Sequence, residues 1–193
     1  EETFWPQHPD DQEWEVKVPL TNVYWGAAGT LHCLQSLKSS GYAECRDWKK
    51  YFAKAYAVYA QTPDLDKFNP GLYCGELGIL LLQYRWAPTP DLEMKIFNCI
   101  QATIPTKENE IMWGIPGGLI AAVKMIEWSN STKHWQPLII ELSKELISRM
   151  HIDEDGNYVW TQDLYGQIRE HLGAVHGMAG NWCALSLAKK HLP

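Results

Sequence analysis

The chain has 193 residues, of which 46% are hydrophobic and 21% charged, and its formal net charge is −6. This composition is typical of a globular protein and excludes a predominantly disordered chain. The acidic excess argues against nucleic acid as the main partner, because phosphate binding requires a basic surface. No apolar run approaches the roughly 18–20 residues of a membrane-spanning helix, so no transmembrane segment is predicted. Five widely spaced cysteines without a C-x-x-C pair favour a reducing, cytoplasmic location.

A four-residue frame, Gly-x-x-Gly, occurs four times along the chain. The frames lie at residues 26–29, 75–78, 114–117 and 177–180. Each frame is followed by an apolar, helix-forming stretch and is preceded by an aromatic residue, a cysteine or a histidine. A single frame of this kind carries little information, but four in the same context indicate a structural repeat. We therefore interpret residues 1–193 as a single domain built from repeats.

Two kinds of helix alternate with these frames. The stretches 47–60, 91–102 and 134–150 carry apolar residues at helical spacing on one face, which is typical of surface helices. The stretches 77–84 and 119–126 are apolar nearly all round, which is typical of buried helices. The pattern predicts an all-α fold with a double layer of inner and outer helices, either an α/α toroid or a solenoid. Glycines at the start of an inner helix would allow close approach of backbones.

A different pattern interrupts the helices between residues 153 and 172. This segment is expected to be a long loop, and Asp155-Gly156-Asn157 within it is a turn signal. Tyr158, Val159 and Trp160 follow the turn and have high strand propensity. The sequence therefore predicts one short β-hairpin before the fourth inner helix.

The fourth frame carries a more specific signature. The segment Leu172-Gly-Ala-Val-His-Gly-Met-Ala-Gly180 resembles the Gly-Ala-x-His-Gly-x-x-Gly signature of lanthionine synthetase C-like (LanC-like) proteins. Residues 110–117 resemble the family's acidic-x-x-x-Gly-x-x-Gly segment, and residues 23–31 and 70–79 resemble its earlier repeats. The family fold has seven inner and seven outer helices, so the resemblance implies the N-terminal half of a seven-hairpin barrel. We expect further polypeptide, the C-terminal half of the toroid or another chain, to cover the apolar faces at its open end.

The resemblance also implies a reaction. LanC-like enzymes are zinc-dependent and add a thiol, from a peptide cysteine or glutathione, to dehydroalanine or dehydrobutyrine in a dehydrated peptide or protein. A metal holds the thiol as the nucleophilic thiolate, and a placed acid protonates the enolate carbon. The family's zinc ligands are a Cys and a later Cys-His-Gly motif. This chain contains no Cys-His-Gly, so zinc is expected for the full-length family and no metal ligand is assigned here.

His176 and Glu110 are the candidate catalytic residues. His176 directly precedes the fourth frame, and an ordinary imidazole pKa of about 6.5 suits both proton uptake and release. It would lie at an inner helix N-terminus, whose positive potential favours an anionic intermediate. Glu110 occupies the acidic position of the third frame and would orient His176 or accept a proton from the thiol or water. The alternatives are a core histidine satisfied by its neighbours and a solvated glutamate at a helix start.

Arg169 and Trp113 are the candidate substrate-binding residues. Arg169 would bind a carboxylate or phosphate of the substrate, or is simply a charge on a surface loop. Trp113 belongs to a group of tryptophans that either line a central cavity or pack in the core; the others are Trp25, Trp160 and Trp182. Three cysteines near the frames, Cys33, Cys74 and Cys183, are expected to pack as small buried residues.

Two other functions fit the same sequence. A helical-repeat scaffold or binding protein would keep the toroid without catalysis. An α/α-barrel carbohydrate enzyme would need two carboxylates across the cavity, for which Glu110, Asp163 and Glu76 are available. The spacing of these three residues does not single out a pair.

Overall fold

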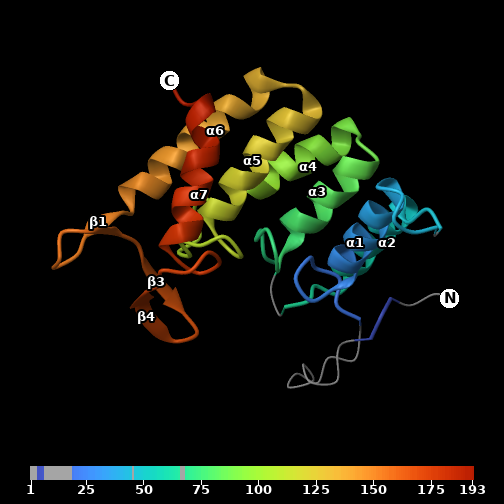
Figure 1. Ribbon diagram of the computed structural model, residues 1–193, viewed down its shortest axis with the longest axis horizontal. Helices are drawn as coiled ribbons and strands as arrows, with labels where there is room; N and C mark the ends of the chain where they lie inside the picture. The colour runs from blue at the N-terminus through green and yellow to red at the C-terminus, as the bar shows by residue number, and fades with distance from the viewer. Residues whose placement is uncertain (1–3, 7–18, 45, 66–67) are drawn as a thin grey trace.

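The computed structural model describes residues 4–6, 19–44, 46–65 and 68–193 (Figure 1). The helices within this part of the chain are α1 (Ala27–Ser39), α2 (Lys49–Gln61), α3 (Glu76–Trp86), α4 (Pro90–Gln101), α5 (Ile115–Ser129), α6 (Thr132–Ser148), α7 (Met178–Ala188) and the 3-10 helix η2 (Lys189–His191). The strands are β1 (His151–Ile152), β2 (Tyr158–Val159), β3 (Thr161–Leu164) and β4 (Gln167–Glu170). The prediction of a mostly helical chain is confirmed.

The helices that begin at the glycine frames form one series. Helix α1 contacts α3, α3 contacts α5, and α5 contacts α7. The amphipathic helices α2, α4 and α6 each pack against the frame helix before and the frame helix after them. Figure 1 shows this succession running from α1 and α2 at one side to α6 and α7 at the other. The predicted alternation of two kinds of helix is therefore present in the described residues.

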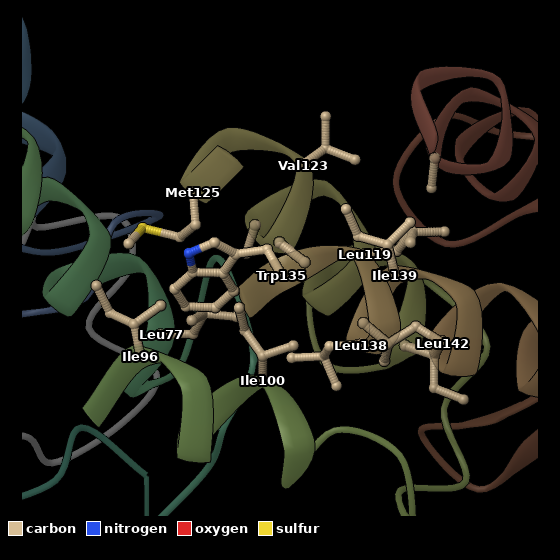
Figure 2. Close-up of a cluster of buried hydrophobic side chains, with 14 of the residues drawn as sticks. Leu77, Ile96, Ile100, Leu119, Val123, Met125, Trp135, Leu138, Ile139 and Leu142 are labelled. Atoms are coloured by element: carbon tan, nitrogen blue, oxygen red, sulfur yellow. The ribbon is translucent and has the colours of Figure 1, made fainter. Parts of the chain in front are cut away.

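The main core lies between α3, α4, α5, α6 and α7. Trp135 of α6 is fully buried in this core, which also contains Ile96, Ile100, Leu119 and Ile139, drawn in Figure 2. Its indole N–H donates to Ser129 Oγ at 3.0 Å, so this large side chain is buried without losing its hydrogen bond. A smaller cluster joins α1, α2 and α3 through residues including Leu31, Phe52 and Tyr59.

Each glycine frame lies under the loop that leads into it. A Cβ atom on the second glycine would stand far inside contact distance of the carbonyl oxygen six residues earlier. These pairs are Gly29 with Val23 (2.1 Å), Gly78 with Leu72 (2.1 Å), Gly117 with Ile111 (2.3 Å) and Gly180 with Ala174 (2.2 Å). The predicted close approach of backbones is confirmed, and its partner is the preceding loop of the same repeat. The frame repeats in sequence because the same loop is packed on four helix starts.

The segment expected to be a loop with one hairpin contains two hairpins. β1 pairs antiparallel with β2, as the Asp155-Gly156 turn predicts, and β3 pairs antiparallel with β4. The second hairpin was not predicted, because Gln162, a polar residue, occupies a buried position in β3 and masks the alternation of a strand. Trp160 lies between the hairpins, 1% exposed, and donates to Leu146 O at 2.7 Å. It therefore belongs to the core.

Other burial predictions were partly wrong. Cys74 is buried as expected, whereas Cys33 and Cys183 are exposed. Cys33 lies on the side of α1 away from the buried residues Leu31 and Gln35, and Cys183 lies on the uncovered side of α7. Helical position alone did not determine their burial, because a neighbouring helix has to cover that face. Among the described residues, no helix combines the length and apolar character needed to cross a bilayer.

Candidate functional site

The loops that precede the four frames are joined by backbone hydrogen bonds. Val23 N donates to Tyr73 O at 3.1 Å, Tyr73 N to Met112 O at 3.3 Å, and Ile111 N to Val175 O at 3.2 Å. These bonds connect residues that lie two or three positions before the frames of successive repeats. The residues directly before the frames are Trp25, Cys74, Trp113 and His176. The loops therefore form a continuous rim, with His176 in its last described member.

His176 and Glu110 meet across two of these loops. His176 Nδ1 lies 2.8 Å from Glu110 Oε2, although 66 positions separate the residues in sequence. The glutamate side chain is completely buried, whereas the histidine side chain is 32% exposed. An ionised carboxylate only accepts hydrogen bonds, so Nδ1 carries the hydrogen and Nε2 is left as the basic nitrogen. The arrangement is that of a histidine oriented by a buried carboxylate.

The Glu110 carboxylate is also bonded to its own loop. It accepts hydrogen bonds from Met112 N at 3.1 Å and from Trp113 N at 2.7 Å. Burial raises the pKa of this carboxyl, and the bonds from the two amides and from His176 oppose the rise without cancelling it. The alternative of a solvated glutamate at a helix start is therefore wrong.

Asn22 occupies the position of Glu110 in the first repeat. It lies four residues before Gly26, as Glu110 lies four residues before Gly114. Asn22 Oδ1 accepts from Tyr24 N at 2.8 Å and from Trp25 N at 2.9 Å, the two amides equivalent to those bound by Glu110. An amide side chain is thus sufficient to hold the loop. The ionisable group at Glu110 adds a partner for His176.

Tyr165 is a site residue that the sequence did not reveal. Its ring lies edge-on to the His176 imidazole, with centroids 6.0 Å apart and planes at 90°. Burial raises the pKa of the phenol, the Glu110 charge adds to the rise, and a hydrogen bond with the Trp113 side chain opposes it. Trp113, predicted to bind substrate, therefore lies beside Tyr165 and Glu110. The one available signal was Gly166, a turn residue directly after Tyr165.

The β3–β4 hairpin that carries Tyr165 is fastened to the loop of Glu110. Asn109 N donates to Gln162 Oε1 at 2.9 Å, and the Gln162 amide donates back to Asn109 O. Asn109 Nδ2 also donates to Thr161 O at 3.0 Å. Because Asn109 directly precedes Glu110, these hydrogen bonds fix the position of the β3–β4 hairpin relative to the Glu110 carboxylate. This explains why a polar glutamine is fully buried in β3.

Arg169 has a less direct relation to the site. It lies in β4 opposite Gln162 and is exposed. No contact described for Arg169 brings it to His176 or Glu110, so its role in substrate binding stays a prediction. Arg149 is the arginine with extensive contacts, and it donates to Ile104 O and Thr106 O at 2.6 Å each. These bonds fasten the end of α6 to the loop after α4.

The described residues do not form a zinc site. No three His, Cys, Asp or Glu side chains in this part of the chain lie close enough together to hold a metal ion. Burial, with the charges of Glu110 and Asp64, raises the pKa of the Cys74 thiol to about 12, and burial raises that of Cys99 as well. Zinc bound by ligands that this chain does not carry stays a prediction of the resemblance.

The two other carboxylates considered for carbohydrate chemistry have separate partners. Glu76 Oε1 accepts from Tyr56 Oη at 2.7 Å and lies between α2 and α4. Asp163 forms an exposed ion pair of 2.6 Å with Lys107. No described contact pairs either residue with Glu110.

Comparison with known proteins adds no family to this picture. No protein-family model matches the chain, and no curated protein matches it significantly. The interpretation of the site therefore depends on its geometry and on the resemblance carried by residues 110–117 and 172–180.

Proposed function

We propose that this chain is the N-terminal half of a LanC-like enzyme that adds a thiol to dehydroalanine or dehydrobutyrine. The observation that supports the proposal most directly is the 2.8 Å contact between His176 Nδ1 and the buried Glu110 carboxylate. The two residues carry the acidic and histidine positions of the family-like segments, and the fold brings them together. A dehydrated peptide or protein is the proposed acceptor, and a peptide cysteine or glutathione the proposed thiol.

The chain's own residues supply proton transfer in this reaction. His176 Nε2 takes the proton from the incoming thiol, and sulfur bonds to the β-carbon of the dehydro residue. The electron pair of the C=C bond moves toward the carbonyl and gives an enolate. The imidazolium then returns the proton to the α-carbon, so atoms and charge balance and the histidine is regenerated. The Glu110 carboxylate stabilises the imidazolium between the two transfers and holds the ring.

Zinc, in this proposal, is bound by residues that do not belong to this chain. The C-terminal half of the toroid, or another chain, is the proposed carrier of its ligands. A cytoplasmic location belongs to the same proposal. The exposed thiols of Cys33 and Cys183 support it, since free surface thiols suit a reducing compartment.

Glutathione addition to a synthetic dehydroalanine peptide, followed by mass spectrometry, tests the proposal on this chain together with the C-terminal half of the toroid, in the presence of zinc. We expect the wild type to exceed the buffer rate and His176→Ala to lower the enzymatic rate by about 10²-fold or more, as for loss of a general acid–base. His171→Ala is the matched control, because His171 is partly buried in the same loop and has no described contact with Glu110. A wild-type rate equal to buffer, or an active His176→Ala, would refute the proposal.

A binding or scaffold function is the second candidate. Apolar side chains of the C-terminal repeat and the neighbouring strand are exposed: Ile168, Leu172, Val175, Trp182 and Leu187. Such a concentration is typical of a surface that another polypeptide covers. The proposed occupant is the C-terminal half of the toroid or another chain. Light scattering on natively purified protein tests this candidate. A complex larger than one chain supports it, and a stable monomer without a co-purifying polypeptide contradicts it.

A further inference from the structure

The tip of the β3–β4 hairpin has an unusual residue. Tyr165 has φ 54° and Gly166 has φ 72°, so both central residues of the turn have positive φ, as a type I′ turn requires. Glycine adopts this conformation without steric cost, whereas a tyrosine does so at a cost. The turn therefore holds a large aromatic side chain in a place where local conformational preference favours Asn, Asp or Gly. The contacts made by that side chain must compensate for the strain.

The Tyr165 side chain lies at the His176 site. Its ring is edge-on to the His176 imidazole, and the residue is 76% exposed, so the hydroxyl is accessible to a ligand. A phenol is protonated at neutral pH and has one hydrogen to donate. The hydrogen bonds described for the chain give this hydroxyl no acceptor within the protein. A neutral O–H donor that is open to solvent is thus placed beside His176.

The position of the hairpin is fixed as well. Gln162 and Asn109 exchange hydrogen bonds, and Leu164, the residue before Tyr165, is buried. Tyr165 is consequently not a side chain on a freely moving loop. Its backbone is fastened to the residue that precedes Glu110. A donor held by a rigid support is the requirement for stabilising charge that develops during a reaction.

We propose that Tyr165 is a third catalytic residue of this site, whose hydroxyl donates a hydrogen bond to the carbonyl oxygen of the ligand that His176 acts upon. The inference rests on the proposed function, in which that oxygen gains negative charge when the enolate forms. His176 moves the proton, Glu110 orients His176, and Tyr165 stabilises the enolate oxygen. The ligand class is a residue within a peptide, with a carbonyl next to the reacting carbon.

Tyr165→Phe removes the hydroxyl and keeps the ring, so it tests the donor separately from packing. In the thiol-addition assay we expect kcat/KM to fall by about 10²-fold, as for the loss of one oxyanion donor. Tyr158→Phe is the matched control, because Tyr158 is an exposed tyrosine in the other hairpin. A structural role would leave Tyr165→Phe close to wild type, and that result would overturn the inference.

A binding measurement separates this inference from the proposed function. The probe is N-acetyl-S-methylcysteine N-methylamide, a thioether with the required carbonyl, titrated into full chain with labelled histidine and followed by NMR. We expect the His176 signals to shift, and Tyr165→Phe to weaken the Kd about tenfold relative to wild type and Tyr158→Phe. An equal Kd in Tyr165→Phe, or no binding to wild type, overturns the role of Tyr165. Wild type that binds the probe through Tyr165 but adds no thiol would instead refute the proposed function alone.

Discussion

Gly78→Ala distinguishes two reasons for a glycine in the frame. Gly78 is the fourth residue of the second frame and lies within the first turn of α3. If the position required no close approach, alanine would stabilise the helix by up to about 1 kcal/mol, because glycine has the lower helix propensity. The structure predicts instead that Gly78→Ala destabilises the protein. The added Cβ would stand 2.1 Å from Leu72 O and 2.6 Å from Val23 Cγ2.

The expected magnitude follows from what has to move. Leu72 O is a backbone atom, so rotating a side chain does not relieve the clash, and the overpacking penalty of about 1–3 kcal/mol applies near its upper end. After the gain in helix propensity, about 2 kcal/mol of destabilisation remains. For a chain of this size that corresponds to a decrease in Tm of about 4–8 °C.

Thermal and urea unfolding of Gly78→Ala and Gly173→Ala measure this effect. Gly173 is the matched control, because a Cβ there meets no atom within 4 Å and its φ is not in the left-handed region. We expect Gly173→Ala to unfold close to wild type and Gly78→Ala to unfold earlier in both assays. If Gly78→Ala is as stable as wild type or more stable, the loop does not pack on the frame as described, and the explanation of the repeat is wrong.

Two further predictions concern ionisable groups. Burial raises the pKa of Glu110, so the folded state binds the proton of this carboxyl more tightly than the unfolded state does. The contribution of Glu110 to the free energy of unfolding is therefore present at low pH and is lost as the pH rises above about 4.5. Urea unfolding should therefore show wild type losing stability relative to Glu110→Gln between pH 4 and pH 7, and a relative gain would contradict the sign. Cys33 and Cys183 are exposed and should react with iodoacetamide in the folded protein, whereas Cys74 and Cys99 should react only after unfolding. Peptide mapping measures all four, and rapid labelling of Cys74 in the native state would show that its burial is wrong.

The sequence indicates His176 and Glu110 as candidates, but the contact between them is visible only in the structure. His176 and Glu110 stand beside glycine frames, and a frame is a local pattern because its loop packs on the helix that immediately follows. Their mutual contact spans 66 positions and was a hypothesis until the hydrogen bonds between successive loops placed them together. Tyr165 was missed because its position depends on Gln162 bonding to Asn109, 53 residues away. No nearby residue type signals such a bond.

The repeat, the alternation of buried and amphipathic helices, and the position of a helix after each glycine frame are readable from the sequence, because helical period and glycine spacing act within a few residues. Tertiary structure decided which polar and reactive groups are buried. Glu110 is buried, Cys33 and Cys183 are exposed, and the ring of Tyr165 lies edge-on to His176. Burial depends on which distant element covers a face, and that arrangement sets the pKa of each group and therefore the chemistry available at the rim.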